Sequence, residues 1–327
     1  MIFLIVKERT VPVKIKLGKA LLRRLPKNHP KRATIEQDLA KGQAGYKGEE
    51  ALDFYLKRLP QKNFYIFQDL RLQHTYSYFQ IDTLILSPCF AVILEVKNIS
   101  GTLYFDPYFQ QLIRTMNDKV EGFQDPLTQV RRQSELFKKW ITEHNIPDIP
   151  IKNFVVISHP STIITTPPEN SQALQTVCHA FQLVSKIEAL TNHFIKEKLS
   201  EKNLKKLNRL LIKKHNPLQY NIQHYNISQN EILKGVHCPE CSFIPMARVQ
   251  GAWVCANCNT RAKDAHVETI DDYFLLIRPT VTNKQLRQFL QISSPDLCNR
   301  ILRALNLPCT GKGKGRIYFQ SEPLEKN

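Results

Sequence analysis

The stretch "FQIDTLILSPCFAVILEVKN", residues 79–98, constrains the fold more than any other, because two apolar runs flank one short turn. Runs of this kind predict a β-hairpin in the interior of a sheet. The hairpin nevertheless carries Asp82, Glu95 and Lys97. Because an unpaired charge is costly to bury, these three side chains require either one another or an ion as partner.

The register of the hairpin predicts where these charges lie. Side chains alternate along a strand, so Glu95 and Lys97 share one face, and a turn symmetric about residues 88 and 89 places Asp82 opposite Glu95. Like charges in that position repel each other. A divalent cation offsets the repulsion, and Mg²⁺ (or Mn²⁺) prefers carboxylate, water and phosphate oxygens. Lys97 then stabilises a phosphate or orients a water nucleophile, and a surface salt bridge is the alternative interpretation.

Motifs around the hairpin occur in an order that resembles the nuclease-related domain (NERD) family, whose core is that of PD-(D/E)xK nucleases. The motifs are "GYKGEE" at residues 45–50, then "QIDTLIL" and "ILEVKN", and "DPLTQ" at residues 125–129. The resemblance covers roughly residues 42–145. It implies a restriction-endonuclease-like mixed sheet flanked by helices, and metal-dependent hydrolysis of phosphodiester bonds in DNA. Thr83 departs from the family, which usually has histidine after the aspartate.

The resemblance also implies roles for individual residues. Asp82 and Glu95 would bind the metal ion, and Lys97 would be the catalytic lysine. Glu49 matches an acid of an upstream helix that completes the metal site, although acids are also ordinary in the first turn of a helix. Gln129 matches a glutamine of a later helix, where a polar residue near a helix start is the alternative.

Four of the eight cysteines have the spacing C-x2-C-x13-C-x2-C; they are Cys238, Cys241, Cys255 and Cys258. Two pairs of thiolates on two turns close a tetrahedral Zn²⁺ site, and the intervening residues suit a β-hairpin with Gly251 at its turn. A redox site needs only one C-x-x-C, and disulfides do not suit a chain expected in the cytoplasm. The spacing therefore predicts a structural zinc ion in a zinc ribbon.

The C-terminal part of the chain is strongly basic. From Arg278 to Arg316 it carries eight Lys or Arg and one acid. A helix, the break "QISS" and a second helix from Pro295 predict a helix-turn-helix, and "GKGKGRIYF" is typical of the wing of a winged helix. A small unit that docks protein is the alternative. The candidate DNA contacts are Arg300, Arg303, Lys312, Lys314 and Arg316.

The net charge of +17 favours a polyanionic partner, with nucleic acid first, DNA before RNA, and an anionic membrane surface second. No apolar run reaches the length of a membrane span, and the sequence predicts no signal peptide, so we expect a cytoplasmic location. A catalytically silent nucleic-acid-binding protein that keeps the nuclease fold as a scaffold is the alternative function. An adaptor that binds anionic lipid is a third hypothesis.

These patterns predict five segments in the order of the chain. They are a basic N-terminal arm (1–33), a nuclease-like α/β domain (34–215), a polar linker (216–235), a zinc ribbon (236–266) and a helix-turn-helix or winged-helix-like unit (267–327).

Overall fold

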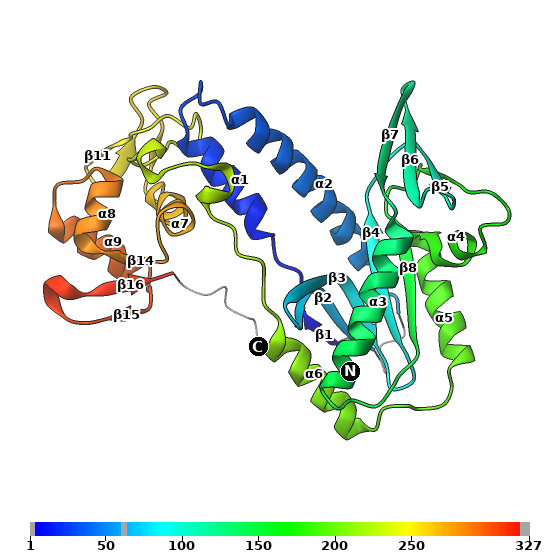
Figure 1. Ribbon diagram of the computed structural model, residues 1–327. Coiled ribbons are helices and arrows are strands. Elements are labelled where there is room, and N and C mark those ends of the chain that lie inside the picture. Colours follow the sequence, from blue (N-terminus) through cyan, green and yellow to red (C-terminus); the bar gives the residue numbers. More distant parts are fainter. Residues whose placement is uncertain (1–3, 60–63, 321–327) are drawn as a thin grey trace. The chain divides into compact units, whose positions relative to one another are not determined.

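The computed structural model of the chain describes residues 4–59 and 64–320 (Figure 1). Residues 1–3 of the predicted arm, 60–63 of the predicted α/β domain and 321–327 of the predicted C-terminal unit lie outside the described residues. The described residues have the predicted class, since helices combine with both mixed and antiparallel sheets.

The chain divides into two compact units. Unit 1 comprises the described residues up to Val11 together with Gln43–Leu218, and unit 2 comprises Pro12–Gly42 together with the described residues from Gln219 onward. The division falls within helix α2 (Arg32–Leu56), whose first part belongs to unit 2 and whose second part belongs to unit 1.

Unit 1 is built on a six-stranded mixed sheet with the strand order β1-β2-β3-β4-β8-β10 (Figure 1). The strands β2, β3 and β4 are antiparallel neighbours, whereas β1 runs parallel to β2, and β4, β8 and β10 are parallel. The strands are β1 (Leu4–Lys7), β2 (Tyr65–His74), β3 (Ser77–Leu86), β4 (Ala91–Lys97), β8 (Ile151–Ile157) and β10 (Val177–His179).

The β3–β4 hairpin has the predicted register. Thr83 pairs with Leu94 and Leu86 with Ala91, as a turn symmetric about residues 88 and 89 requires. Strand β4 and the second half of β3 are almost continuously buried, because helices cover both faces of the sheet.

Helix α3 (Pro126–Glu143) and helix α6 (Glu201–Lys214) pack on the face of β4 that contains Ile93. The second part of α2 and helix α5 (Leu183–His193) pack on the opposite face, which contains Val92. Alternation along β4 therefore directs Glu95 and Lys97 toward α3.

A smaller sheet of unit 1 has the order β7-β6-β5-β9 and lies beyond the carboxyl ends of β4 and β8 (Figure 1). It is followed by a short helix α4 and a 3-10 helix η1. These elements are β5 (Thr102–Asp106), β6 (Gln111–Met116), β7 (Lys119–Gln124), β9 (Ile163–Thr165), α4 (Ser171–Thr176) and η1 (Ala180–Gln182).

Unit 2 contains α1, the first part of α2 and every element from η2 onward. Its two small sheets have the orders β11-β12-β13 and β14-β16-β15. The elements are α1 (Val13–Arg24), η2 (Ile222–Tyr225), η3 (Gln229–Glu231), β11 (Ala247–Val249), β12 (Ala252–Val254), β13 (Arg261–Ala262), α7 (His266–Leu276), β14 (Thr280–Thr282), α8 (Asn283–Leu290), α9 (Pro295–Ala304), β15 (Cys309–Thr310), η4 (Gly313–Gly315) and β16 (Ile317–Phe319).

Residues 4–33 differ from the predicted basic arm, since they contribute β1 to unit 1 and α1 to unit 2. Helix α1 is amphipathic, and its residues Leu17 and Leu21 are fully buried in the core of unit 2. Arg24 is buried as well, because Asp272 of α7 lies 2.9 Å from its Nε. The high lysine content of the segment conceals this apolar face, which is evident only at helical periodicity.

Residues 216–235 differ from a plain polar linker for a similar reason. They form η2 and η3, and four of their side chains are buried in the core of unit 2. The four are Ile222, Tyr225, Ile227 and Ile232. Because these apolar residues are separated by polar ones without strand or helix periodicity, the sequence pattern does not predict their burial.

None of the helices in the part of the chain that the structure describes combines the length and the apolar character that a membrane crossing requires.

Candidate functional site

The strands β3 and β4 separate at the point where the charged residues begin. Their backbone pairing is regular up to Thr83 and Leu94. Beyond this pair, the backbone N–H of Val96 donates to Oδ2 of Asp82 at 2.9 Å. The Asp82 carboxylate therefore accepts a backbone hydrogen bond from β4 in place of a backbone carbonyl of β3. It lies beside Glu95, as the hairpin register predicts.

The Glu95 carboxylate is enclosed by two donors. Its side chain is 3% exposed, and Nζ of Lys97 lies 2.6 Å from Oε1. Nε2 of Gln133 donates to Oε2 at 2.7 Å. A buried carboxylate needs such partners, since an unpaired charge in the interior is strongly unfavourable.

Helix α3 supplies the second layer of contacts above β4. Its N-cap Asp125 accepts hydrogen bonds from the backbone N–H groups of Leu127 and Thr128, which explains the start of the "DPLTQ" motif. Gln129 and Gln133 are one turn apart and point to the same side of the helix. Oε1 of Gln129 accepts from Nζ of Lys97 at 3.1 Å.

Gln133 was not predicted as a site residue. The signal that reveals it is its i+4 spacing from Gln129 on an amphipathic helix, and this spacing becomes informative only when α3 is known to lie over β4.

Glu49 reaches the same region from helix α2. Gly48 allows the helix to approach the ends of β4 and β8, because a Cβ at this position would lie 2.3 Å from Cβ of Asn98 and 2.8 Å from Oγ of Ser158. Asn98 also donates from Nδ2 to the carbonyl oxygen of Ala44 at 2.8 Å. The close contact explains the second glycine of "GYKGEE", and nothing in the structure explains Gly45.

The acids of the site influence one another. Burial raises the pKa of Asp82 well above its usual value, and the charges of Glu95 and Glu49 raise it further. Burial also raises the pKa of Glu49 to about 7, although the nearby guanidinium of Arg9 opposes this shift. The charges of the three carboxyl groups therefore act on one another. The ammonium group of Lys97 contacts one of the three, that of Glu95.

We expect the stability of the fold to depend on pH through Glu49. Its pKa rises from about 4.5 to about 7 on folding, so the stabilising contribution is complete below about pH 4.5 and is lost as the pH rises through about 7. One pKa unit corresponds to about 1.4 kcal/mol, so Glu49→Gln should gain up to about 3 kcal/mol of unfolding free energy relative to wild type between pH 4.5 and pH 8. Urea denaturation of both proteins across this range measures the effect, and a difference that does not vary with pH contradicts it.

The structure thus brings together five residues that the sequence singled out: Asp82, Glu95, Lys97, Glu49 and Gln129. The acids do not form a closed ligand group. Within residues 4–59 and 64–320, the four cysteines are the one group of three or more ligand-type residues whose ligand atoms all lie within 4.8 Å of one another.

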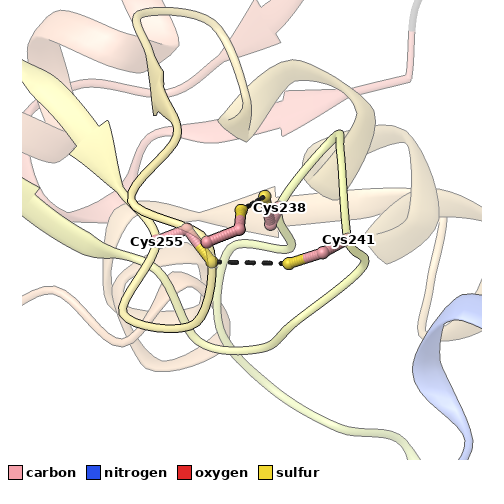
Figure 2. A group of neighbouring side chains, drawn as sticks. Cys238, Cys241 and Cys255 are labelled. Carbon is pink, nitrogen blue, oxygen red and sulfur yellow. Dashed lines mark hydrogen bonds between the residues drawn. The ribbon is translucent and has the colours of Figure 1, made fainter.

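The four cysteines converge as their spacing predicts. Sγ of Cys238 lies 3.6 Å from Sγ of Cys258, and Sγ of Cys241 lies 3.5 Å from Sγ of Cys255. Figure 2 shows Cys238, Cys241 and Cys255 pointing toward one another from two loops. Both loops are joined by the β11–β12 hairpin, whose turn at Gln250 and Gly251 has positive φ at both residues.

The environment acts differently on the thiols of the cluster, since burial raises the pKa of Cys238 to about 11. Hydrogen bonds, first of all with the side chain of Asn257, lower the pKa of Cys241 to about 6. His237 is not part of the cluster, because its ring nitrogens contact Thr269 and Glu268. His266 is engaged as well, since Nε1 of Trp253 donates to its Nδ1 at 3.1 Å. The cluster is therefore a group of four sulfur ligands that can hold a metal ion, and it is compatible with a zinc ribbon.

The predicted DNA contacts lie on α9 and in the region of η4. Arg300 and Arg303 are exposed on α9, and Lys312 is exposed before η4. Lys314 lies within η4, and Arg316 follows it. The charge of Arg300 also reaches Arg248 of the ribbon, where it adds to burial in lowering the pKa of that guanidinium.

A mixed sheet whose central hairpin carries two carboxylates and a lysine beneath a helix defines unit 1 as a nuclease-like α/β fold. Residues 44–158 match the family model described as "Nuclease-related domain" (NERD). The match confirms the resemblance seen in the sequence. For the matched residues it indicates a nuclease-related function.

Comparison with curated proteins finds no match. Among solved structures, the crystal structure of protein VC1899 from Vibrio cholerae is similar to this chain with 10% identity and a TM-score of 0.27. The similarity covers 55% of this chain and 50% of that chain, so this chain spans about half of the length of that protein.

Proposed function

We propose that the protein is a metal-dependent nuclease that hydrolyses phosphodiester bonds in DNA, with the ribbon and the C-terminal unit as accessory DNA-binding modules. The contact of Lys97 with both Glu95 and Gln129, next to Asp82, is the observation that supports this function most. An ammonium group and two carboxylates at one end of a sheet provide a cation site and a donor for a phosphate oxygen.

The residues present fit a divalent cation. The carboxyl groups of Asp82 and Glu95 are hard oxygen ligands, and their mutual repulsion, which raises the pKa of Asp82, is relieved when a cation lies between them. Two carboxylates suffice for Mg²⁺, which takes its remaining ligands from water and phosphate. When bound, such an ion polarises the phosphate and lowers the pKa of a bound water.

Two glutamines of α3 orient the side chains of Glu95 and Lys97. Gln133 holds Oε2 of Glu95, so the direction of the carboxylate is set from α3. Gln129 holds the ammonium of Lys97, whose side chain is 23% exposed and so remains accessible to a phosphate oxygen or a water. Glu49 adds a third negative charge from α2.

The proposed activity is tested by incubating the full chain with supercoiled plasmid and with branched DNA, in Mg²⁺ or Mn²⁺ and in excess EDTA. We expect cleavage in the presence of either metal ion and none in EDTA. An RNA substrate of the same length tests the preference for DNA. Absence of turnover on every substrate with either metal ion contradicts the proposal.

We also propose that the four cysteines bind Zn²⁺ as a structural ion. A Zn–S distance of about 2.3 Å in a tetrahedral site places the sulfurs about 3.8 Å apart. The sulfur–sulfur distances of 3.5 and 3.6 Å are close to this value. Four thiolates leave no open position for substrate, so the ion would hold the two loops together rather than take part in hydrolysis.

The C-terminal elements support a winged-helix-like DNA-binding module. Helices α8 and α9 are joined by a short turn, and β16 pairs with both β14 and β15, with η4 between β15 and β16 in the chain. In such a module α9 would enter the major groove and the segment around η4 would contact the backbone. The exposed Arg300 and Arg303 of α9 are suitably placed for either base edges or phosphates.

We expect Arg300→Ala combined with Arg303→Ala to weaken DNA binding and to reduce the salt dependence. Each lost phosphate contact lowers the slope of log K against log salt by about one unit, so the double variant should lose up to about two. Fluorescence anisotropy with a labelled duplex from 50 to 200 mM salt measures the slope. Lys205→Ala is the control, because this lysine is paired with Glu201 on α6. An unchanged slope in the double variant argues against a DNA contact through α9.

A catalytically silent nucleic-acid-binding protein is the second candidate function. It is favoured by the fact that both oxygens of Glu95 already accept hydrogen bonds from the chain. Such a protein would bind DNA in a salt-sensitive manner that survives Glu95→Ala and would show no metal-dependent turnover. The plasmid assay and the anisotropy assay together distinguish the two functions.

A further inference from the structure

Arg9 is a charged residue of the site that lies outside residues 44–158, the part matched by the family model. It follows β1, and its side chain is only 3% exposed. Its Nη1 donates to Oε2 of Glu49, and its Nη2 lies 3.4 Å from Oγ1 of Thr83. Arg9 thus reaches Glu49, one of the carboxylates of the proposed nuclease site, and Thr83, the neighbour of Asp82 in β3.

The position of Arg9 is set by contacts on both its backbone and its side chain. The backbone N–H of Arg9 donates to Oε1 of Gln68 at 2.8 Å. Nε2 of Gln68 donates in turn to Oδ1 of Asp53 at 2.5 Å, and Nη2 of Arg9 lies 3.8 Å from the same oxygen. The guanidinium is therefore anchored among acids and is not a mobile surface group.

The guanidinium of Arg9 brings a positive charge to these acids. Three acids experience its charge. Burial raises the pKa values of Glu49, Asp53 and Asp69, and Arg9 opposes the increase at each of them. Arg9 thus balances the carboxylates on the α2 side of the site, while Lys97 balances Glu95 on the α3 side.

A second divalent cation and Arg9 would compete for the same carboxylate. Glu49 lies close enough to Asp82 and Glu95 for their charges to interact, so it is the acid that could complete a two-ion site. We propose that Arg9 is a positioning residue that takes the place of a second metal ion, holding Glu49 as its ion-pair partner so that the site binds one divalent cation, at Asp82 and Glu95. The inference rests on the proposed metal-dependent function, and it specifies how many divalent cations the site binds.

The number of Mn²⁺ ions bound by the full chain, with the ribbon loaded with zinc beforehand, tests the inference. Electron paramagnetic resonance of free Mn²⁺ during titration counts them. We expect one ion for wild type, one for Arg9→Lys, which keeps the charge, and two for Arg9→Gln, which removes it. The double variant Arg9→Gln/Glu49→Gln should return to one bound ion.

Lys57→Gln is the control, because it removes an exposed cation that also acts on Asp53, and it should keep one bound ion. An Arg9→Gln protein that binds one ion with wild-type affinity overturns the inference.

Glu49→Gln provides an independent test if Arg9→Gln does not fold, as judged by circular dichroism. Because Glu49 is assigned to Arg9 and not to the metal ion, the variant should bind one Mn²⁺ within about threefold of the wild-type affinity. A loss of tenfold or more identifies Glu49 as a ligand and overturns the inference. Asp82→Asn should abolish Mn²⁺ binding. A wild-type protein that binds no Mn²⁺ removes both the proposed function and the inference, whereas one ion in both wild type and Arg9→Gln leaves the function intact.

Discussion

Replacement of Lys97 by alanine should reduce the metal-dependent cleavage of DNA by at least about a hundredfold. The ammonium of Lys97 is the donor of the site that contacts both Glu95 and Gln129, and it remains partly exposed toward substrate. Removal of one donor that stabilises developing charge typically costs about 10²–10³ in rate. The variant also leaves Oε1 of Glu95 without its cation, so metal affinity should rise or remain unchanged while turnover falls.

Initial rates of plasmid nicking at saturating Mg²⁺ measure this effect, and Mn²⁺ titration of the same protein separates metal binding from turnover. Lys138→Ala is a suitable control, since this exposed lysine of α3 pairs with Asp148 away from the site. Turnover of Lys97→Ala equal to that of wild type would falsify the proposed catalytic role. A parallel loss of Mn²⁺ binding would instead assign Lys97 to the architecture of the cation site.

Replacement of Cys255 by serine should remove the zinc ion that we propose for the four cysteines, and should unfold much of unit 2. Cys238 and Cys255 are buried in the same apolar core as Trp253 and helix α7, so the metal site and the core form together. Apparent binding free energies of structural zinc are about 10–16 kcal/mol, which is comparable to the whole stability of a domain, about 5–15 kcal/mol. The loss of the ion should therefore eliminate the cooperative melting of unit 2.

Metal content by emission spectroscopy and the melting profile by calorimetry measure the two parts of this prediction. The transition of unit 1 should persist, because its apolar clusters contain no residue of unit 2 among the described residues. Cys309→Ser is the matched control, since this cysteine is exposed on β15 and lies outside the cluster. A Cys255→Ser protein with a full equivalent of zinc and an unchanged profile contradicts the structural role.

Local periodicity accounts for most of what was predicted correctly. Alternation along β4 placed Glu95 and Lys97 on one face, and the symmetric turn placed Asp82 next to them, because both depend on short-range backbone geometry. The cysteine spacing predicted the cluster for the same reason, since each C-x2-C lies within one turn. The break before Pro295 likewise predicted the boundary between α8 and α9.

The parts that the sequence did not predict depend on contacts between distant residues. The role of Gly48 follows from the approach of α2 to Asn98, fifty residues later in the chain. The burial of α1 follows from Asp272, which neutralises Arg24 across most of the length of the protein. No local pattern encodes such distances, because an apolar or charged residue does not specify which partner it meets.

The site itself also combines features set by local sequence patterns with features set by contacts between distant residues. The sequence alone determined its charged residues on the β3–β4 hairpin and their common face, because a strand has a period of two. The tertiary structure alone decided that Gln133 holds Glu95 and that Arg9 reaches Glu49, because α3 and the segment after β1 acquire these positions only by packing against the sheet. The balance of charge at the site is therefore a property of the fold, although each charge is evident in the sequence.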